Sequence, residues 1–554
     1  MAPLSLLTVC VLCFGQETAP LPRIDRSGVR PVLLVDGRPF LVLGGQINNS
    51  SAWSVTLPTV WPVLDVMHAN TLEAPVYWET LEPAQGNFDF TQTDALLTGA
   101  REHHKRLVLL WFGTWKNGSP SYVPEWIKRD PVRYPLARKT DGTLSFSLSP
   151  FGEATLAADS KAFAALMHHL KTADPEHTVI MVQVENETGM WGGMRDHSQA
   201  ADQAFAAPVP GVILHSMGKD KARGNWSDVF GPDADEFFYA WSIARYVEQV
   251  AEAGRRELAL PLYVNAALRD PLTLGPPLSF ESGGPTYDVL PLWHAVAPIL
   301  DGINPDIYMP EYSKVSAVLA QYALPWNAYF IPEIGNAVGY ARFFFTVLGS
   351  GAFGFSPFGM DASGFSNYPL GSKTVDAESI APFAQNNELA GAISQELAGW
   401  IQQGKVHGVA EDTATHVQKL DLSVPGSDKT HWSATISYGL PTFYSDKPAS
   451  GNAAPSGEAM VVTLGQDEFL VAGFHCRVDF QPVGSAAGAQ RMWVSVEEGT
   501  YVHGIWQRSR LWNGDQTDYG LNFIDRPQLL RVRLLTYDLP NEAGKPLHAT
   551  TELH

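Results

Sequence analysis

Short apolar runs alternate with longer segments of helical spacing through the first two-thirds of the chain. In one such segment Phe163, Leu166, Met167 and Leu170 recur at i, i+3, i+4 and i+7, which places them on one face of a helix. A short apolar run bounded by turn residues is typical of a strand covered on both faces. The runs cover residues 40–47, 70–78, 107–115, 178–187, 261–267, 300–309, 328–336 and 351–359.

Eight strands with intervening helices predict an α/β fold of the (β/α)₈ or TIM-barrel type, which we place at residues 20–404. Just before the first barrel strand, which we expect to end at Gln46, Asp36-Gly37 separates two apolar runs and predicts a β-hairpin. A doubly wound parallel sheet is the alternative. It would require a reversal of strand order, which this pattern does not reveal.

The pattern changes after a helix-like segment at residues 386–405. Short strand patterns separated by turns follow, including "HWSATISYG", "AMVVTLG", "FLVAGFHCRVDF", "RMWVSVEEG" and "LLRVRLLTYDL". Such a series predicts an all-β, sandwich-like domain, which we place at residues 405–554.

Composition and charge exclude several classes of partner. The chain has 554 residues, of which 45% are hydrophobic and 17% charged, and its formal net charge is −20. These values are typical of a globular protein and make a nucleic acid an unfavourable partner. No apolar stretch reaches the roughly 18 residues of a membrane span.

The N-terminus resembles a secretion signal, since Leu4 to Phe14 form a short apolar core followed by small and polar residues. We therefore expect a signal peptide at residues 1–19 and export to the periplasm or the exterior. An N-terminal apolar strand is the alternative. If the signal is removed, Cys10 and Cys13 leave with it, and Cys476 alone cannot form an internal disulfide.

Two of the apolar runs end in carboxylates. In "VQVENETG" alternation places Met181, Gln183, Glu185 and Glu187 on one face, with Glu187 nearest the carboxyl end of the strand. The run at 328–336 ends in the same way, at Glu333. Active sites of such barrels lie at the carboxyl ends of the strands, and two carboxyl groups across a cleft are the equipment of glycoside hydrolysis. A buried polar network without chemistry is the alternative.

Other polar and aromatic residues occupy similar positions. Asp306 and Tyr308 end the sixth run, where they could orient Glu333 or serve in packing, and Tyr308 is also a candidate for substrate contact. Trp115 and Trp191 follow the third and fourth runs and are candidates for stacking on sugar faces, although tryptophan often belongs to the core. No Cys/His spacing predicts a metal site.

The run containing Glu187 resembles the strand-four signature of glycoside hydrolase family 35, the retaining β-galactosidases. That signature is Val-Glu-Asn-Glu followed by an aromatic residue and Gly, and Thr188 replaces the aromatic residue here. The resemblance implies that Glu187 is the acid/base, that Glu333 is the nucleophile, and that Asn186 binds the sugar 2-hydroxyl. It implies no cofactor and no metal.

Further segments extend the resemblance. "EAPVYWETLEPAQGNFDF" is similar to the family's strand-two region, where Trp78, Glu82 and Pro83 match, so Trp78 becomes a candidate for substrate contact. In the strand-three region Thr114 stands where the lysosomal-type branch has Glu. The overall pattern resembles bacterial members that release galactose from plant polysaccharides.

The resemblance implies an exo-acting, retaining β-galactosidase that hydrolyses terminal β-D-galactosyl residues of oligo- or polysaccharides by double displacement. Another retaining glycosidase with the same two glutamates is the first alternative, such as a family 42 β-galactosidase, a β-glucosidase or a mannanase. A non-catalytic carbohydrate-binding protein on the same scaffold is the second. The sequence indicates neither the oligomeric state nor the natural linkage.

Overall fold

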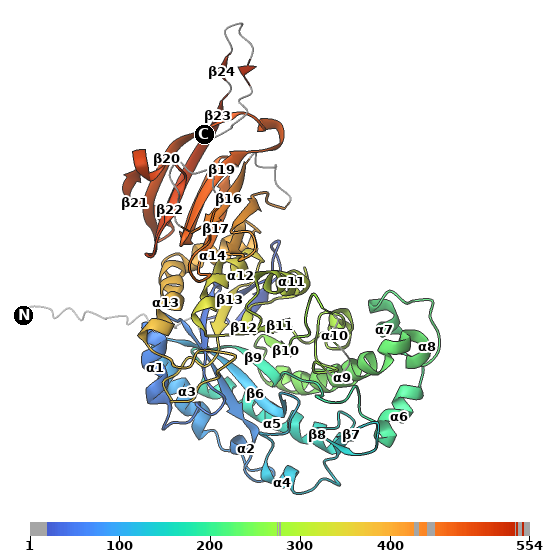
Figure 1. Ribbon diagram of the computed structural model, residues 1–554. Coiled ribbons are helices and arrows are strands. Elements are labelled where there is room, and N and C mark those ends of the chain that lie inside the picture. Colours follow the sequence, from blue (N-terminus) through green and yellow to red (C-terminus); the bar gives the residue numbers. More distant parts are fainter. Residues whose placement is uncertain are drawn as a thin grey trace, which may run out of the picture.

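A closed barrel of eight parallel strands forms the centre of the molecule, with a β-rich region beside it (Figure 1). The computed structural model describes residues 19–273, 275, 279–425, 432–439, 449–537, 539–540 and 546–547. The predicted signal peptide lies outside these residues, apart from its last position. Among the described helices, none is long and apolar enough to cross a membrane.

The barrel strands follow one another around the barrel in chain order, and each of the eight predicted runs overlaps one of them. They are β4 (Val42–Gln46), β5 (Thr71–Tyr77), β6 (Arg106–Lys116), β9 (Val179–Asn186), β10 (Leu262–Ala267), β11 (Gly302–Ile307), β12 (Ile331–Ile334) and β13 (Gly354–Pro357). All neighbours pair in parallel, and β13 closes the ring on β4. The predicted α/β barrel is therefore confirmed, and the doubly wound alternative is wrong.

Helices cover the outside of the barrel. The larger ones are α1 (Leu57–Val66), α3 (Thr91–Glu102), α5 (Glu153–Ala173), α9 (Ala234–Glu257), α11 (Tyr312–Tyr322) and α13 (Ala377–Gly391). In α5 the predicted apolar positions Phe163, Leu166, Met167 and Leu170 are all buried, as a helix packed on a sheet requires.

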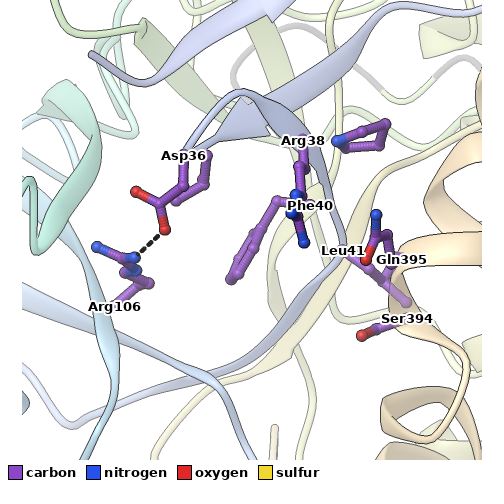
Figure 2. A pocket seen from close by; sticks show the side chains of 9 residues that line it. Asp36, Arg38, Phe40, Leu41, Arg106, Ser394 and Gln395 are labelled. Carbon is purple, nitrogen blue, oxygen red and sulfur yellow. Dashed lines mark hydrogen bonds and ion pairs between the residues drawn. The ribbon is translucent and has the colours of Figure 1, made fainter. Parts of the chain in front are cut away.

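The amino end of the barrel carries a small antiparallel sheet of β1 (Arg23–Asp25), β2 (Val32–Val35) and β3 (Arg38–Phe40). The predicted hairpin joins β2 to β3, with φ of 52° at Asp36 and 76° at Gly37. Positive φ at both central residues suits the twist of a two-residue hairpin. A cavity of about 350 Å³ lies beside this hairpin and α14 (Ser394–Gln402), where Asp36 pairs with Arg106 (Figure 2).

The β-rich region consists mainly of two antiparallel sheets with a shared apolar core. One contains β14 (Val406–Ala410), β17 (Glu458–Gly465), β18 (Glu468–Phe474), β20 (Gln490–Val502), β21 (Ile505–Trp512) and β23 (Leu529–Tyr537). The other contains β15 (Val417–Asp421), β16 (Trp432–Tyr438), β19 (Cys476–Pro482) and β22 (Leu521–Phe523). The predicted all-β region is confirmed.

One predicted strand in this region is in fact two. The pattern "FLVAGFHCRVDF" reads as a single strand, but β18 belongs to the first sheet and β19 to the second. His475 separates them with φ of 48°, a left-handed conformation that ends a strand. Strands that change sheets through such a residue carry the chain between the two layers of a sandwich.

The first sheet of this region packs directly against the barrel domain. Phe474 stacks on Phe345 of α12 (Phe344–Gly349), with ring centroids 6.3 Å apart. The Phe345 backbone N–H donates to the Glu458 carboxyl group at 3.3 Å, and burial raises the pKa of Glu458 to about 8. Residues of the sheet and of the barrel thus form one continuous hydrophobic core.

Candidate active site

The carboxyl ends of β9, β11 and β12 bring three acidic side chains together. One oxygen from each of Glu187, Asp306 and Glu333 lies within 4.8 Å of the other two, and all three side chains are buried. The glutamates are 6% and 5% exposed, so both side chains are almost completely buried. The two predicted carboxylates therefore share one site.

Glu187 follows β9 directly and is held in an uncommon backbone conformation. Its φ is 43°, in the left-handed region that a glutamate seldom adopts. Its N–H donates to the Asn265 side chain at 2.8 Å, and its carbonyl accepts from the N–H of Gly118 at 3.1 Å. The preceding carbonyl, of Asn186, accepts from the N–H of Asn117 at 3.1 Å. These bonds fix the backbone that carries the Glu187 side chain at the carboxyl end of the barrel.

The environment of Glu187 favours its protonated form. Burial is the largest influence and raises its pKa to about 7, helped by the negative charge of Glu333. The Lys116 ammonium, 4.0 Å from Glu187 Oε2, acts in the opposite direction. A carboxyl group that titrates near neutrality can donate a proton and take one back.

Glu333, on β12, is oriented through both of its oxygens. Gln46, the last residue of β4, donates from Nε2 to Oε2 at 2.9 Å, and the Tyr308 hydroxyl donates to Oε1. Hydrogen bonds of this kind hold a carboxylate in one orientation and satisfy its charge in a dry site. Tyr308 thus orients Glu333, one of the roles considered for it from the sequence.

Asn186, the last residue of β9, carries a free amide. Its side chain is fully buried, and neither its nitrogen nor its oxygen has a hydrogen-bond partner among the described residues. A buried, unsatisfied amide costs free energy unless a ligand completes it. The amide next to Glu187 is therefore available to a polar group of a ligand.

The three tryptophans predicted to contact substrate differ in position. Trp78 is buried in the core, where its N–H donates to Glu82 at 2.9 Å and its ring packs near Trp111. Trp115 is also buried, and its N–H donates to Ser147 at 3.0 Å. Neither ring offers a face to a ligand. Of the three tryptophans, Trp191 alone, at 52% exposure, has a ring that a sugar could contact.

Strict alternation predicts that Glu185 shares the inner face with Glu187, but the structure places it elsewhere. Its φ is 62°, so the strand twists before its end. Its Oε2 accepts from the Trp115 N–H at 2.7 Å, and Asp159 of helix α5 is close enough to raise its pKa, together with burial. Glu185 therefore lies between β6 and the surrounding helices, away from the mouth.

Several residues of the site carried no clear signal in the sequence. Lys116 ends β6 and Asn265 lies on β10, yet neither stood out among neighbouring polar residues. Glu281 lies in an irregular loop after β10. It is buried, and burial and the negative charge of Glu187 raise its pKa.

The carboxyl group of Asp306 completes the cluster. Within the described part of the chain, Glu187, Asp306 and Glu333 are the acidic or histidine side chains spaced closely enough for a cation. Hydrolysis by two carboxyl groups requires none. The arrangement can therefore supply both a proton donor and a nucleophile from protein groups alone.

Comparisons with known proteins match part of the chain. A family model described as a domain of unknown function, DUF5597, matches residues 383–524, from α13 to the second β-sheet. No curated protein matches.

The solved structures to which the chain is similar include three β-galactosidases. The enzyme from Bacillus circulans sp. alkalophilus has 12% identity and a TM-score of 0.46, over 64% of this chain and 57% of that one. The enzyme from Rahnella sp. R3 has 13% identity and a TM-score of 0.46, over 65% of this chain and 58% of that one. The polyextremophilic enzyme from the Antarctic haloarchaeon Halorubrum lacusprofundi has 15% identity and a TM-score of 0.47, over 63% of this chain and 58% of that one. The chain thus aligns with less than two-thirds of each of these proteins, and the chemistry of the site must carry the functional assignment.

Proposed function

We propose that this protein is a retaining exo-β-galactosidase, which hydrolyses terminal β-D-galactosyl residues of oligo- or polysaccharides. The observation that carries the proposal is the Glu187–Glu333 pair, whose oxygens approach within 4.8 Å. Retaining glycosidases hold their two carboxyl groups about 5–5.5 Å apart, whereas inverting enzymes leave about 6.5–9.5 Å for a water molecule. The short separation favours double displacement.

The two glutamates have different roles because their surroundings differ. Glu333, held by Gln46 and Tyr308, attacks the anomeric carbon and forms a covalent glycosyl-enzyme. Glu187, with its pKa raised to about 7, donates its proton to the leaving oxygen. In the second step Glu187 takes a proton from water, which attacks the anomeric carbon and releases the sugar with net retention.

The surrounding residues support a terminal sugar as substrate. The deep position of both glutamates favours a chain end, because an internal residue would need an open groove. We assign the free Asn186 amide to the sugar 2-hydroxyl and the exposed Trp191 ring, just beyond Glu187, to stacking on a sugar face. Galactose itself is proposed from the resemblance of the sequence around Glu187 to family 35.

A panel of aryl β-glycosides tests the sugar preference. We expect kcat/KM for the β-galactoside to exceed that for the β-glucoside and β-mannoside by at least about 100-fold, as a site that hydrogen-bonds the axial hydroxyl would require. NMR of the reaction should show β-galactose as the first-formed product. Early α-galactose would contradict double displacement. A preference for the glucoside or the mannoside would keep the proposed mechanism but contradict galactose as the substrate. Absence of turnover on all three would support a carbohydrate-binding protein instead.

A further inference from the structure

A third carboxyl group lies beside the two that the proposed reaction uses. Asp306 of β11 is the register neighbour of Glu333 on β12, so the two side chains leave the sheet on the same face. One Asp306 oxygen lies within 4.8 Å of oxygens of both glutamates, and the side chain is 2% exposed. The double displacement assigns no task to this group.

Among the described residues, few positive charges lie near the three acidic side chains of the cluster. Lys116 is the cation that influences Asp306, and it also lies beside Glu187. The other polar groups that face Asp306 from the strands and helices around it are Glu187, Glu333, Asn265, Tyr263, Tyr308 and Tyr322. Carboxylates this close in a dry site cannot all be ionised.

The hydrogen bonds of Asp306 indicate which of its two oxygens carries a proton. Its Oδ2 accepts from Asn265 Nδ2 at 2.6 Å, while no N–H group or hydroxyl among the described residues donates to the buried Oδ1. Asn265 also accepts the Glu187 N–H at 2.8 Å, so one amide connects Asp306 to the backbone of the acid/base. A proton on Oδ1 would give that oxygen a hydrogen-bonding function toward the neighbouring carboxylates.

We propose that Asp306 remains a neutral carboxylic acid throughout the proposed galactosidase cycle and acts as a positioning residue for Glu187. When Glu187 gives up its proton, the Asp306 O–H stabilises the new carboxylate, and the Asp306 proton does not leave. An ionised Asp306 would instead oppose that step and repel Glu333. Burial and both glutamates raise the pKa of Asp306, and its hydrogen bonding lowers that of Glu187, in agreement with this arrangement.

Infrared difference spectroscopy tests the protonation state directly. Wild type and Asp306→Asn are compared above the alkaline limb of the activity profile, where Glu187 is ionised. We expect the variant to lose a carboxylic-acid C=O band. Loss of a carboxylate band would overturn the proposal. Asp306→Ala supplies the same difference if the Asn variant does not fold, and Asp174→Asn, at the other end of β9 and paired with Arg101, should lose a carboxylate band.

The pH dependence of kcat/KM gives a second readout that a merely structural role would not produce. Asp306→Asn keeps a neutral donor, so its alkaline limb should stay within about 0.5 pH unit of wild type and its activity within about threefold. Asp306→Ala removes the donor, which should lower kcat/KM roughly tenfold or more and move the limb upward.

If Asp306 were ionised, replacing it by Asn would remove a negative charge and lower the limb by about 1–3 units, which would also contradict the proposal. The inference rests on the proposed function, but the two fail differently. Wrong sugar preference or inversion in the wild type would refute the galactosidase, while the infrared bands would still decide the state of Asp306.

Discussion

Acidic side chains have different partners at the two ends of the barrel. At the amino end Asp36, Asp174 and Asp301 each pair with an arginine, at 2.5, 2.7 and 2.5 Å (the first pair is shown in Figure 2). At the carboxyl end Lys116 is the cation that acts on both Glu187 and Asp306, and these two carboxyl groups lie close to Glu333. Pairing with arginine holds strands in place, whereas crowding of several carboxyl groups favours protonation of some of them. The amino end therefore contributes stability, and the carboxyl end supplies the groups that can react.

The largest loss of activity should follow removal of the proposed nucleophile. Glu333→Ala cannot form the glycosyl-enzyme, so we expect kcat to fall by at least about 10⁴-fold on every substrate, whatever its leaving group. Steady-state assays with an aryl β-galactoside and a galactosyl disaccharide measure this. The circular dichroism spectrum of the variant should match that of wild type, so that the loss does not come from unfolding. Retained turnover on either substrate would show that another group attacks the sugar.

Removal of the acid/base should cost an amount that depends on the leaving group. General acid catalysis contributes roughly 10²–10⁴-fold, but a dinitrophenolate leaves without a proton. Glu187→Ala should therefore lose about that factor on disaccharides while still forming the glycosyl-enzyme from dinitrophenyl β-galactoside. Pre-steady-state release of dinitrophenol measures the first step. Equal losses on both substrates would contradict the role of Glu187 as the acid.

At the amino end the expected loss is one of stability rather than activity. Asp174 pairs with Arg101 and accepts the N–H groups of Thr178 and Val179 at 2.9 and 2.8 Å. Asp174→Ala leaves these buried donors unpaired, so the free energy of unfolding should fall by about 2–4 kcal/mol with kcat/KM unchanged. Chemical denaturation provides the measurement. Glu125→Ala, which breaks the exposed pair with Arg129, is the control and should cost less than about 0.5 kcal/mol.

The smallest effect should be a shift in pH dependence. Glu187 must be protonated for the first step, so kcat/KM should fall as the pH rises through about 7. Lys116 favours the ionised form of Glu187, and its removal in Lys116→Met should raise the pKa of Glu187 and move the alkaline limb up by about one unit. Lys128→Met, which breaks a surface pair with Glu79, should leave the limb in place. A downward shift in the Lys116 variant would refute the assignment.

The sequence revealed the barrel because each strand is a short apolar run buried on both faces, a pattern that needs no knowledge of neighbours. It revealed Glu187 and Glu333 because a carboxylate at the end of such a run is unusual. It misplaced Trp78 and Trp115, since an apolar ring after a strand looks the same in a core and in a cleft. The register of β6 is irregular between Trp111 and Lys116, so alternation could not identify Lys116 as the residue beside Glu187.

Glu281 and Asn265 show a second limit. Glu281 lies in a loop without periodicity, so only the folded chain brings it near Glu187. Asn265 acts through a hydrogen bond to a backbone N–H that is 78 residues away in the chain. The positive φ of Glu185 is likewise a tertiary effect, because no local residue preference predicts a left-handed glutamate within a strand.

Azide rescue compares the two proposed roles most directly. Azide needs no base, so with dinitrophenyl β-galactoside it should speed turnover of Glu187→Ala and yield β-galactosyl azide, identified by NMR. Glu333→Ala should give no β-azide, and Glu185→Ala should show no rescue because that side chain lies outside the mouth. The β-azide from Glu333→Ala, with Glu187→Ala inactive on all substrates, would reverse the assignment and contradict the account.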